Sequence, residues 1–418
     1  MSRRLAEKLA RVKPGTLYAG VDVALERNYA MVITEQAQVL AQFGFPNGRD
    51  GYDYFYRRLE ILEEQRQAPA LLVGMEPTNY FWKLLAADLE RRQIPYRLVN
   101  PFTVKRHREG DQLDDSKDDP RDAFTIADLL RTGKYTETRL LHGPYAELRQ
   151  YVVLHDRLQR DIRRHKNLIR NSVGQLFPEL PRVFKDFSGS TALAMLRSCA
   201  AAAVIREMSA EQFVRRVRAE FRGQRLQVSQ LRRAYDLAAT SVGLQDVIPA
   251  LQLGSRLYIG QLEKLESQAK QVRTALTDTF LELPESPYLL SVNGLGLLTA
   301  ATILAEIGDP RHYRRAAQLV KLAGIQPVPN TSGRKTRSKT PMSHKGRPRL
   351  RTALFFAVMR LVQVNQAFAH TYRYYQQREK NPLTKMQALG ALMNKLLRVL
   401  WALMKHQTFY NPSFGLAD

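Results

Sequence analysis

Short apolar runs separated by polar turns dominate the first hundred residues, which is the pattern of β-strands. Five such runs predict strands at residues 17–24, 29–33, 39–43, 70–76 and 96–100. Two segments that space apolar residues three or four apart predict helices, at residues 51–64 and 80–92. Three strands in a row, followed by helix, strand, helix and strand, predict an α/β domain built on one sheet.

Further along the chain the periodicity becomes helical. Residues 147–170 predict a long basic amphipathic helix that ends before Phe177-Pro, and residues 247–281 predict another. Gly254 and Gly260 weaken the first turns of the second helix. Beyond Gly260 it fits either a short coiled coil or one helix of a bundle.

These patterns divide the chain into four predicted parts. They are a basic N-terminal arm at 1–15, an α/β domain at 16–145, a helical connector at 146–285 and a mostly α-helical C-terminal domain at 286–418. A chain of 418 residues has room for two or three domains.

Composition narrows the choice of partners. The formal net charge is +24 and the pI is near 10.2, which favours nucleic acid or an anionic membrane surface as a partner. No uncharged apolar run is long enough to span a membrane, and the N-terminus lacks the apolar core of a signal peptide. Cys199 is the only cysteine, so no internal disulfide forms. We expect a cytoplasmic protein without a membrane partner.

The acidic segment from Lys117 to Ala123 stands out in this basic chain. Asp119 and Asp122 lie three residues apart, which places both carboxylates on one face of a helix. Like charges at that spacing repel unless a cation lies between them, and Mg²⁺ prefers such oxygen ligands. The simpler alternative is an acidic turn that caps the helix beginning near Ala123.

Two more carboxylates lie in or after predicted strands. Asp22 is flanked by valines, and Glu76 ends an apolar strand before Pro77. A desolvated carboxylate needs a partner or a metal. Together with Asp119 and Asp122 they fit a two-metal site for phosphodiester chemistry. A solvent-facing position for Asp22 and a loop-entry role for Glu76 remain alternatives.

A turn-rich segment from Ser332 to Arg351 carries eight basic residues and no acidic one. They are Arg334, Lys335, Arg337, Lys339, Lys345, Arg347, Arg349 and Arg351. Phosphate is the natural partner for so many cations, and the positive field stabilises a phosphorane-like transition state. Arg163 and Arg164 of the long basic helix are further candidates for backbone contacts, although a solvated helix face explains them equally well.

Two small-residue motifs have competing explanations. The turn Gly294-Leu-Gly296 opens an apolar helix and looks like half of a helix-hairpin-helix, where backbone amides meet a phosphate, but a tight packing turn fits as well. Ser332-Gly333 is a candidate nucleophile among cations. Serine at such a position is more often a simple turn residue, and Thr331, Ser338 and Ser343 are nearby hydroxyls.

The N-terminal and C-terminal motifs together resemble one family. Gly-Val-Asp22-Val-Ala, Gly-Met-Glu76-Pro-Thr and Lys-Asp-Asp119-Pro-Arg-Asp122-Ala resemble the DEDD transposases of insertion sequences, which have a RuvC-like, RNase H-type N-terminal domain. Leu-Ala-Gly-Ile-Gln-Pro327, Ser332-Gly and Ser343-His-Lys-Gly resemble that family's C-terminal transposase domain. Asp118 stands where the family commonly has Thr, so a register using Asp115 and Asp118 is an alternative.

The resemblance implies a mechanism. It gives Asp22, Glu76, Asp119 and Asp122 the role of binding Mg²⁺ or Mn²⁺, and gives Ser332 the role of a nucleophile that links covalently to DNA. It further implies double-stranded DNA at the element ends and target, a guide (bridge) RNA encoded by the element, a dimer or tetramer held partly by a coiled coil, and a prokaryotic, nucleoid-associated protein.

Three functions therefore compete. The first is an insertion-sequence recombinase that acts through a phosphoserine intermediate. The second is a metal-only, structure-specific nuclease similar to a junction resolvase, in which Ser332 is structural. The third is a nucleic-acid-binding protein without catalysis, whose acidic residues are a relic.

Overall fold

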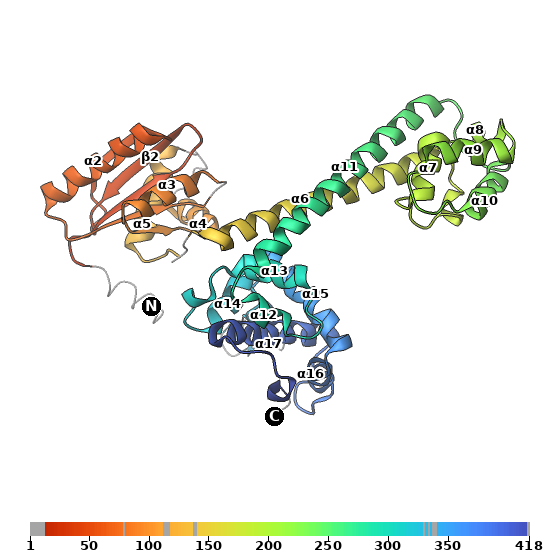
Figure 1. The fold of residues 1–418 in the computed structure, drawn as a ribbon. Coiled ribbons are helices and arrows are strands. Elements are labelled where there is room, and N and C mark those ends of the chain that lie inside the picture. Colours follow the sequence, from red (N-terminus) through yellow and green to blue (C-terminus); the bar gives the residue numbers. More distant parts are fainter. Residues whose placement is uncertain are drawn as a thin grey trace. The chain divides into compact units, whose positions relative to one another are not determined.

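The computed structural model describes residues 13–77, 80–111, 118–136, 140–328, 331–332, 335–336 and 341–415. Its internal contacts divide the chain into two compact units, Met1–Leu140 and Leu141–Asp418. The two units are drawn in red to yellow and in yellow to blue in Figure 1. The predicted basic arm, residues 1–15, falls almost entirely outside the described residues.

The first unit is built on a mixed five-stranded sheet of order β3-β2-β1-β4-β5. Its strands are β1 (Leu17–Asp22), β2 (Arg27–Ile33), β3 (Val39–Pro46), β4 (Leu71–Met75) and β5 (Tyr96–Leu98). The first three form the expected antiparallel meander, and β4 and β5 run parallel to β1. All five predicted strands are confirmed, with ends shifted by a few residues.

Helices cover both faces of this sheet. They are α2 (Arg49–Arg66), α3 (Phe81–Arg91), α4 (Pro101–Asp111) and α5 (Asp119–Arg131). Alternate residues of a strand point to opposite faces. Ala19, Val21 and their neighbours accordingly pack with the cores of α2 and α3, whereas Tyr18 packs with α5. This mixed α/β unit is consistent with an RNase H-like domain.

The sequence pattern did not reveal α4. Its residues are mostly polar and carry no apolar stripe, and Val104 is its buried hydrophobic side chain in the described part. The helix forms because Pro101 suits a first helical position and because Val104 joins the core around α5. The polar residues of α4 therefore gave no helical pattern in the sequence, and packing around Val104 stabilises the helix.

The second unit contains two long helices, α6 (Gly143–Leu176) and α11 (Ile248–Leu281). They pack side by side (Figure 1). The predicted break at Phe177 is confirmed, whereas Gly254 and Gly260 do not interrupt α11. Buried residues of α11 such as Ile259, Leu262 and Leu276 are covered within the same chain. The apolar stripe, for which the sequence leaves a coiled coil and a helix bundle both open, thus has an intramolecular partner in α6.

A small helical module occupies one end of this helix pair. It comprises a 3-10 turn (Leu180–Arg182), α7 (Ser190–Ser198), α8 (Ala202–Arg206), α9 (Ala210–Glu220) and α10 (Val228–Ala238). Its core joins Phe213 and Leu231 to Ile169 of α6 and Ile259 of α11. Cys199 is a buried free thiol in this core.

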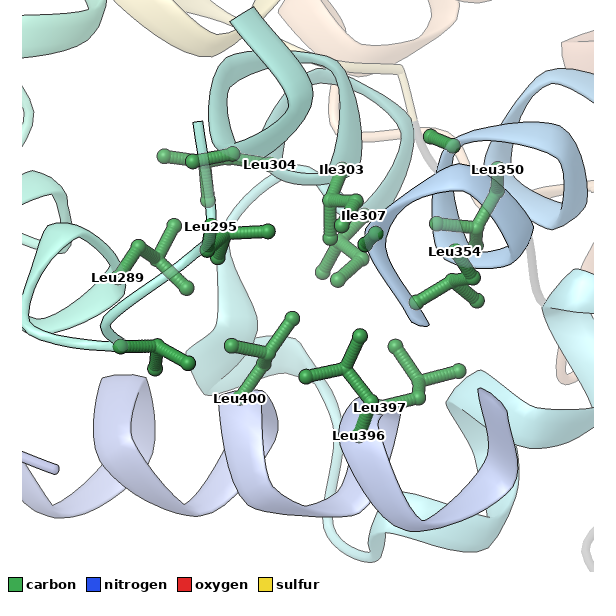
Figure 2. Close-up of a cluster of buried hydrophobic side chains, with 14 of the residues drawn as sticks. Leu289, Leu295, Ile303, Leu304, Ile307, Leu350, Leu354, Leu396, Leu397 and Leu400 are labelled. Atoms are coloured by element: carbon green, nitrogen blue, oxygen red, sulfur yellow. The ribbon is translucent and has the colours of Figure 1, made fainter. Parts of the chain in front are cut away.

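The C-terminal core occupies the other end of the pair. Its elements are α12 (Ser286–Leu290), α13 (Leu297–Ile307), a 3-10 turn (Pro310–His312), α14 (Ala316–Ala323), β6 (Thr331–Ser332), β7 (Lys335–Thr336), α15 (Pro348–Val364), α16 (Gln366–Gln377), α17 (Lys385–His406) and a 3-10 turn (Pro412–Gly415). Figure 2 shows Leu396 and Leu400 of α17 facing side chains of α13 and α15, such as Ile303 and Leu354.

Among the described helices, none alone has the length and apolar character needed to cross a membrane. Only α15 and α16 taken together reach that hydropathy, and the pair bends by 99° at its junction.

Candidate active site and nucleic-acid interface

Two of the predicted metal ligands lie at one edge of the N-terminal sheet. Strands β1 and β4 run parallel and pair in register up to Val21 and Met75. Asp22 is the last residue of β1, and Glu76 follows the last residue of β4. Because the strands are parallel neighbours, both acidic residues reach the carboxyl edge of the sheet together. Both side chains are half-buried.

Helix α5 brings the second pair of acidic residues toward that edge. A Cβ atom added to Gly20 would lie 2.1 Å from the carbonyl oxygen of Ala123 and 2.5 Å from the amide nitrogen of Ala127, so α5 rests directly on β1 at this glycine. Asp122 immediately precedes Ala123, and Asp22 lies two strand residues, about 7 Å, beyond Gly20. A glycine on β1 thus sets how closely the helix approaches.

The first turn of α5 presents its two acidic residues differently. Asp119 is exposed, whereas Asp122 is only 6% exposed. Acidic residues in a first turn suit the positive end of the helix dipole, so helix stability also explains their presence. The alternative pair, Asp115 with Asp118, lies partly outside the described residues.

The donor set is chemically suited to a hard divalent cation, because carboxylate oxygens are the ligands that Mg²⁺ and Mn²⁺ prefer. In the described part of the chain, however, no group of three or more His, Cys, Asp or Glu side chains comes close enough to hold a metal ion. The acidic residues lie on neighbouring elements at one side of the domain without forming a closed ligand cluster. The predicted metal roles therefore remain predictions.

Ser332 belongs to the tip of a hairpin-like loop with a well-bonded stem. In the two-residue strands β6 and β7, Thr331 pairs with Thr336 and Ser332 with Lys335. Four backbone hydrogen bonds join the stem below the tip. The amides of Val328, Ser343, His344 and Arg347 donate to the carbonyls of Pro341, Gln326, Gly324 and Leu322, at 2.9, 3.0, 3.0 and 2.7 Å.

Two glycines allow the stem strands to approach each other. A Cβ on Gly346 would lie 2.3 Å from the amide nitrogen of Gly324, and one on Gly324 would lie 2.9 Å from the amide nitrogen of Gly346. Gly324 also adopts a left-handed conformation, with φ of +67°. These contacts explain the glycines in the Leu-Ala-Gly324 and His-Lys-Gly346 motifs as structural requirements of the stem.

A buried carboxylate anchors the base of this loop. Glu306 of α13 is 2% exposed and its carboxylate lies among three arginines. Its oxygens are 2.9 Å from Nη1 of Arg349, 3.7 Å from Nη2 of Arg149 on α6, and 3.8 Å from Nη1 of Arg347. Arg347 also donates a hydrogen bond to the backbone carbonyl of Glu306. We call this set the Glu306 cluster.

The Glu306 cluster extends to α6 through a second acid. Arg349 Nε donates to Asp156 of α6. Burial opposes the charge of Arg349, but its bonds to Asp156 and Glu306 prevail and raise the pKa of Arg349. Burial, followed by the neighbouring charge of Arg347, lowers the pKa of Arg149. The base of the serine loop is thus tied to α13 and α6 by charge.

The predicted phosphate-binding residues of this segment fall into two groups. Arg347 and Arg349 belong to the Glu306 cluster. Arg351 donates from Nη1 to the carbonyl of Ala323 at 3.0 Å. Lys345 is exposed. Arg334, Arg337 and Lys339 lie outside the described residues, and of Lys335 only the backbone is described. Three of the eight basic residues therefore also have structural roles.

The basic face of α6 borders a pocket of about 230 Å³ beside the helical module. Arg163, Lys166 and Arg170 line it, opposite Asp186 and Ser188 of the turn before α7. Lys166 pairs with Glu266 at 3.3 Å, whereas Arg163 and the neighbouring Arg164 are exposed. The exposed arginines stay available for a phosphate backbone.

The Gly294–Gly296 turn is shaped by packing at its first glycine. Gly294 has φ of +98°, and a Cβ there would lie 2.4 Å from Cγ2 of Val364 on α15. Gly296 caps α13 and has open space around it. The packing interpretation therefore accounts for Gly294, while the amide end of α13 at Gly296 stays compatible with a phosphate contact.

Sequence reasoning missed Glu306 and Arg149. Their partners lie 41 to 157 positions away, so spacing along the chain carries no sign of the pairing. One signal was present: a glutamate inside the apolar segment 297–307 must find cationic or hydrogen-bonding partners once it is buried.

Comparisons with known proteins match both ends of the chain to transposases. A model of DEDD transposases of the IS110 type, described as "Transposase", matches residues 19–178. A second model, described as "Transposase IS116/IS110/IS902 family", matches residues 286–373. The first match contains all four predicted metal ligands, and the second contains Ser332 and the Glu306 carboxylate.

Several known proteins are similar to this chain over part or most of its length. The chain is 28% identical to an uncharacterized protein of insertion element IS110 from Streptomyces coelicolor, over 71% of this chain and 72% of the relative. It is 24% identical to an uncharacterized protein of insertion element IS116 from Streptomyces clavuligerus, over 95% and 96%. A pilin gene-inverting protein of Moraxella bovis is 27% identical over 28% of this chain and 36% of the relative.

The two family models and the named relatives place the chain among DNA transposases and recombinases. The chain belongs to the IS110/IS116 family of insertion-sequence transposases. The match to a DEDD transposase model favours the use of a divalent metal.

Proposed function

We propose that the protein cuts and rejoins DNA through a covalent phosphoserine intermediate formed by Ser332. The Ser332 hydroxyl loses its proton, and its oxygen attacks the scissile phosphorus. The bond from phosphorus to the leaving deoxyribose oxygen breaks, and that oxygen takes up a proton. A DNA hydroxyl then attacks the phosphoserine in the reverse sense, which re-forms a phosphodiester and frees the serine.

The acidic residues Asp22, Glu76, Asp119 and Asp122 would hold Mg²⁺ or Mn²⁺ in this scheme. The bound cation would polarise the scissile phosphate and stabilise the attacking and leaving oxygens. The half-buried position of Asp22 and Glu76 at adjoining strand ends supports this role, because both residues bring carboxylate oxygens, the ligands that these cations prefer, to the same edge of the sheet. The proposal requires Ser332 and the acidic residues to act on one phosphate, from one subunit or from two.

The partners follow from the same family resemblance. The DNA would be the element ends and a target duplex, and an element-encoded guide RNA would select the sites by base pairing. The protein would act as a homo-oligomer, a dimer or a tetramer. The exposed arginines of α6 support a nucleic-acid contact that does not depend on base sequence.

One observation carries the proposal: Ser332 belongs to the tip of a loop whose stem is closed by four backbone hydrogen bonds. A braced stem below a serine that has basic neighbours in the sequence suits a nucleophile that must be presented to an outside phosphate. A structural serine in an ordinary surface turn would need no such brace.

The decisive experiment compares Ser332→Ala with Ser343→Ala. Purified protein is incubated with labelled element-end DNA, the guide RNA and Mg²⁺, and protein–DNA adducts are separated on denaturing gels. We expect the parent chain and Ser343→Ala to form an adduct that maps to residue 332, and Ser332→Ala to lose both adduct and strand cleavage. A Ser332→Ala protein that still cleaves DNA would identify a metal-only nuclease.

Asp119→Asn tests the metal half of the scheme in the same assay. Replacing one ligand of an acidic metal site removes charge without changing size, so we expect loss of adduct by a factor of about 100 or more, partly restored at higher metal concentration. Removal of the metal by a chelator should abolish the adduct in the parent chain. Unchanged behaviour in every assay would support a protein that binds nucleic acid without catalysis.

A further inference from the structure

The helical module carries an arginine-rich surface that the catalytic proposal does not use. Residues 206–233 contain eight arginines and three glutamates, with no lysine or aspartate. The arginines are Arg206, Arg215, Arg216, Arg218, Arg222, Arg225, Arg232 and Arg233, and all of them are exposed. Within residues 140–328, which are described throughout, the salt bridges of the module and its helix pair involve other basic residues, such as Arg197 and Lys166.

Three of these arginines converge on one groove. Arg215 and Arg218 lie three apart on α9, and Arg232 faces them from α10, around a groove of about 280 Å³. Val214 and Val228 also line it, and Glu211 is the single carboxylate among its lining residues. We call this site the α9–α10 groove.

Packing does not require these arginines. Helices α9 and α10 are held to the module by Phe213, Val217, Leu231 and Ala234, each with no exposed surface. The arginines lie on the opposite, solvent-facing side of the two helices. Like charges crowded in this way raise the free energy of the folded module, and a bound polyanion removes that cost.

The lining of the groove indicates what kind of polyanion fits. Proteins that bind unpaired nucleotides stack the bases on aromatic side chains, and the groove is lined by arginine, valine, alanine and glutamate. Arginines without a stacking surface match phosphates, which a duplex presents along its outside. An acidic protein surface offers carboxylates at lower density.

The groove lies far from the serine loop along the helix pair. The core of the module includes Ile169 of α6, and the C-terminal core includes Val152 of the same helix. These two residues are about 25 Å apart at 1.5 Å per residue. A duplex in the groove would therefore be held at a place other than the phosphate that is cut.

We propose that the α9–α10 groove is a second nucleic-acid site, which binds the phosphate backbone of a duplex through Arg215, Arg218 and Arg232 without reading base sequence. DNA and RNA duplexes offer the same phosphates, so the experiment includes both. The proposal stands independently of Ser332 chemistry, because it concerns affinity alone.

The test is a binding experiment on the full-length chain. Arg215, Arg218 and Arg232 are replaced together by glutamine, and binding to a 20-base-pair DNA duplex, the matching RNA duplex and a single strand is followed by fluorescence anisotropy over a salt series. We expect tenfold or greater loss of affinity for at least one duplex near 0.15 M salt. The slope of log K against log salt should fall by about two to three, one per lost phosphate contact.

The matched control removes three arginines from the same module outside the groove: Arg206, Arg222 and Arg225, each replaced by glutamine. We expect this variant to lose less than threefold in affinity. Equal losses in the two triple variants would overturn the groove as a site, as would a loss confined to the single strand.

Glu211→Gln gives a readout in the opposite direction. It removes the carboxylate from the groove and should tighten duplex binding about twofold, whereas weaker or unchanged binding counts against the proposal. If circular dichroism shows that the variant with glutamine at 215, 218 and 232 is unfolded, Glu211→Gln alone tests whether the α9–α10 groove binds a duplex. The variant in which Arg215, Arg218 and Arg232 are all glutamine is also tested for adduct formation at Ser332 with saturating DNA. If it still forms the adduct, the loss of duplex binding and the serine chemistry are independent, and failure of one proposal does not imply failure of the other.

Discussion

The acidic edge of the N-terminal unit and the serine loop of the C-terminal unit are held in different ways. At the acidic edge, α5 sits on β1 because Gly20 leaves no side chain between them. The serine loop instead rests on a backbone ladder and on the Glu306 cluster, where arginines from α6 and α15 surround one carboxylate. Steric fit positions the first set of residues, whereas hydrogen bonds and charge position the second.

The difference has a physical origin. Regular strands and helices already direct the side chains at their ends, so the acidic residues need only close packing. A loop has no repeating geometry of its own, and it keeps one conformation only if other groups fix both of its stems. We therefore expect the two regions to respond differently to changes of volume, charge and pH.

Glu306→Gln should have the largest effect. It leaves Arg149, Arg347 and Arg349 around a neutral side chain that is 2% exposed in the parent. Breaking a buried ion pair from one side costs several kcal/mol, and we expect about 3 kcal/mol here because the arginines are partly exposed. Urea unfolding measures this loss of stability, and hydrogen exchange shows whether it falls in α13 and α15.

Asp156→Asn is the matched control for that change. Its pair with Arg349 has side chains 40% and 29% exposed, so we expect a loss below about 1 kcal/mol. If Glu306→Gln and Asp156→Asn lower the free energy of unfolding by the same amount, the buried charge of Glu306 does not hold the serine loop. The proposed difference between the two regions would then be wrong.

Gly20→Ala should follow in size, and it acts on the N-terminal unit alone. The added methyl group would meet the backbone of α5, which cannot rotate away as a side chain can. Overpacking of this kind costs about 2 kcal/mol, and we expect faster hydrogen exchange in α5. Gly174→Ala on α6 has nothing within 4 Å of the new Cβ and should be neutral or slightly stabilising.

Acidification should give the smallest effect, through His155 of the C-terminal unit. Burial lowers the pKa of His155 on α6, which the charge of Asp156 only partly offsets. The unfolded chain then binds more protons below its ordinary pKa of 6.5, so this contribution to stability is present above that pH and is lost as pH falls through it. His155→Gln should reduce the fall in melting temperature between pH 7.5 and 5.5 by on the order of 1 °C.

Much of the fold could be predicted from the sequence. Alternating and continuous apolar runs identified all five strands of the sheet, and helical spacing identified the two long helices. Helix α4 escaped because only Val104 anchors it in the described part. The partner of α11 was also unpredictable, since an apolar stripe shows that a helix is covered without showing by what.

The candidate site divides in the same manner. Residue type and position made Asp22, Glu76, Asp119, Asp122 and Ser332 candidates, and the family resemblance gave them their predicted roles. It did not indicate that Arg347 and Arg349 would bind Glu306, because a run of basic residues looks the same whether it faces solvent, phosphate or a buried carboxylate.

The amino-acid sequence by itself determined which segments become strands and helices and where carboxylates stand relative to strand ends. Those properties depend on neighbours a few positions away, through side-chain periodicity and backbone sterics. Only the tertiary structure decided that Gly20 seats α5, that α6 covers α11 and that Glu306 gathers three arginines. Such contacts join residues up to 157 positions apart, and their free energy comes from desolvation and close packing, which exist only once the chain has folded.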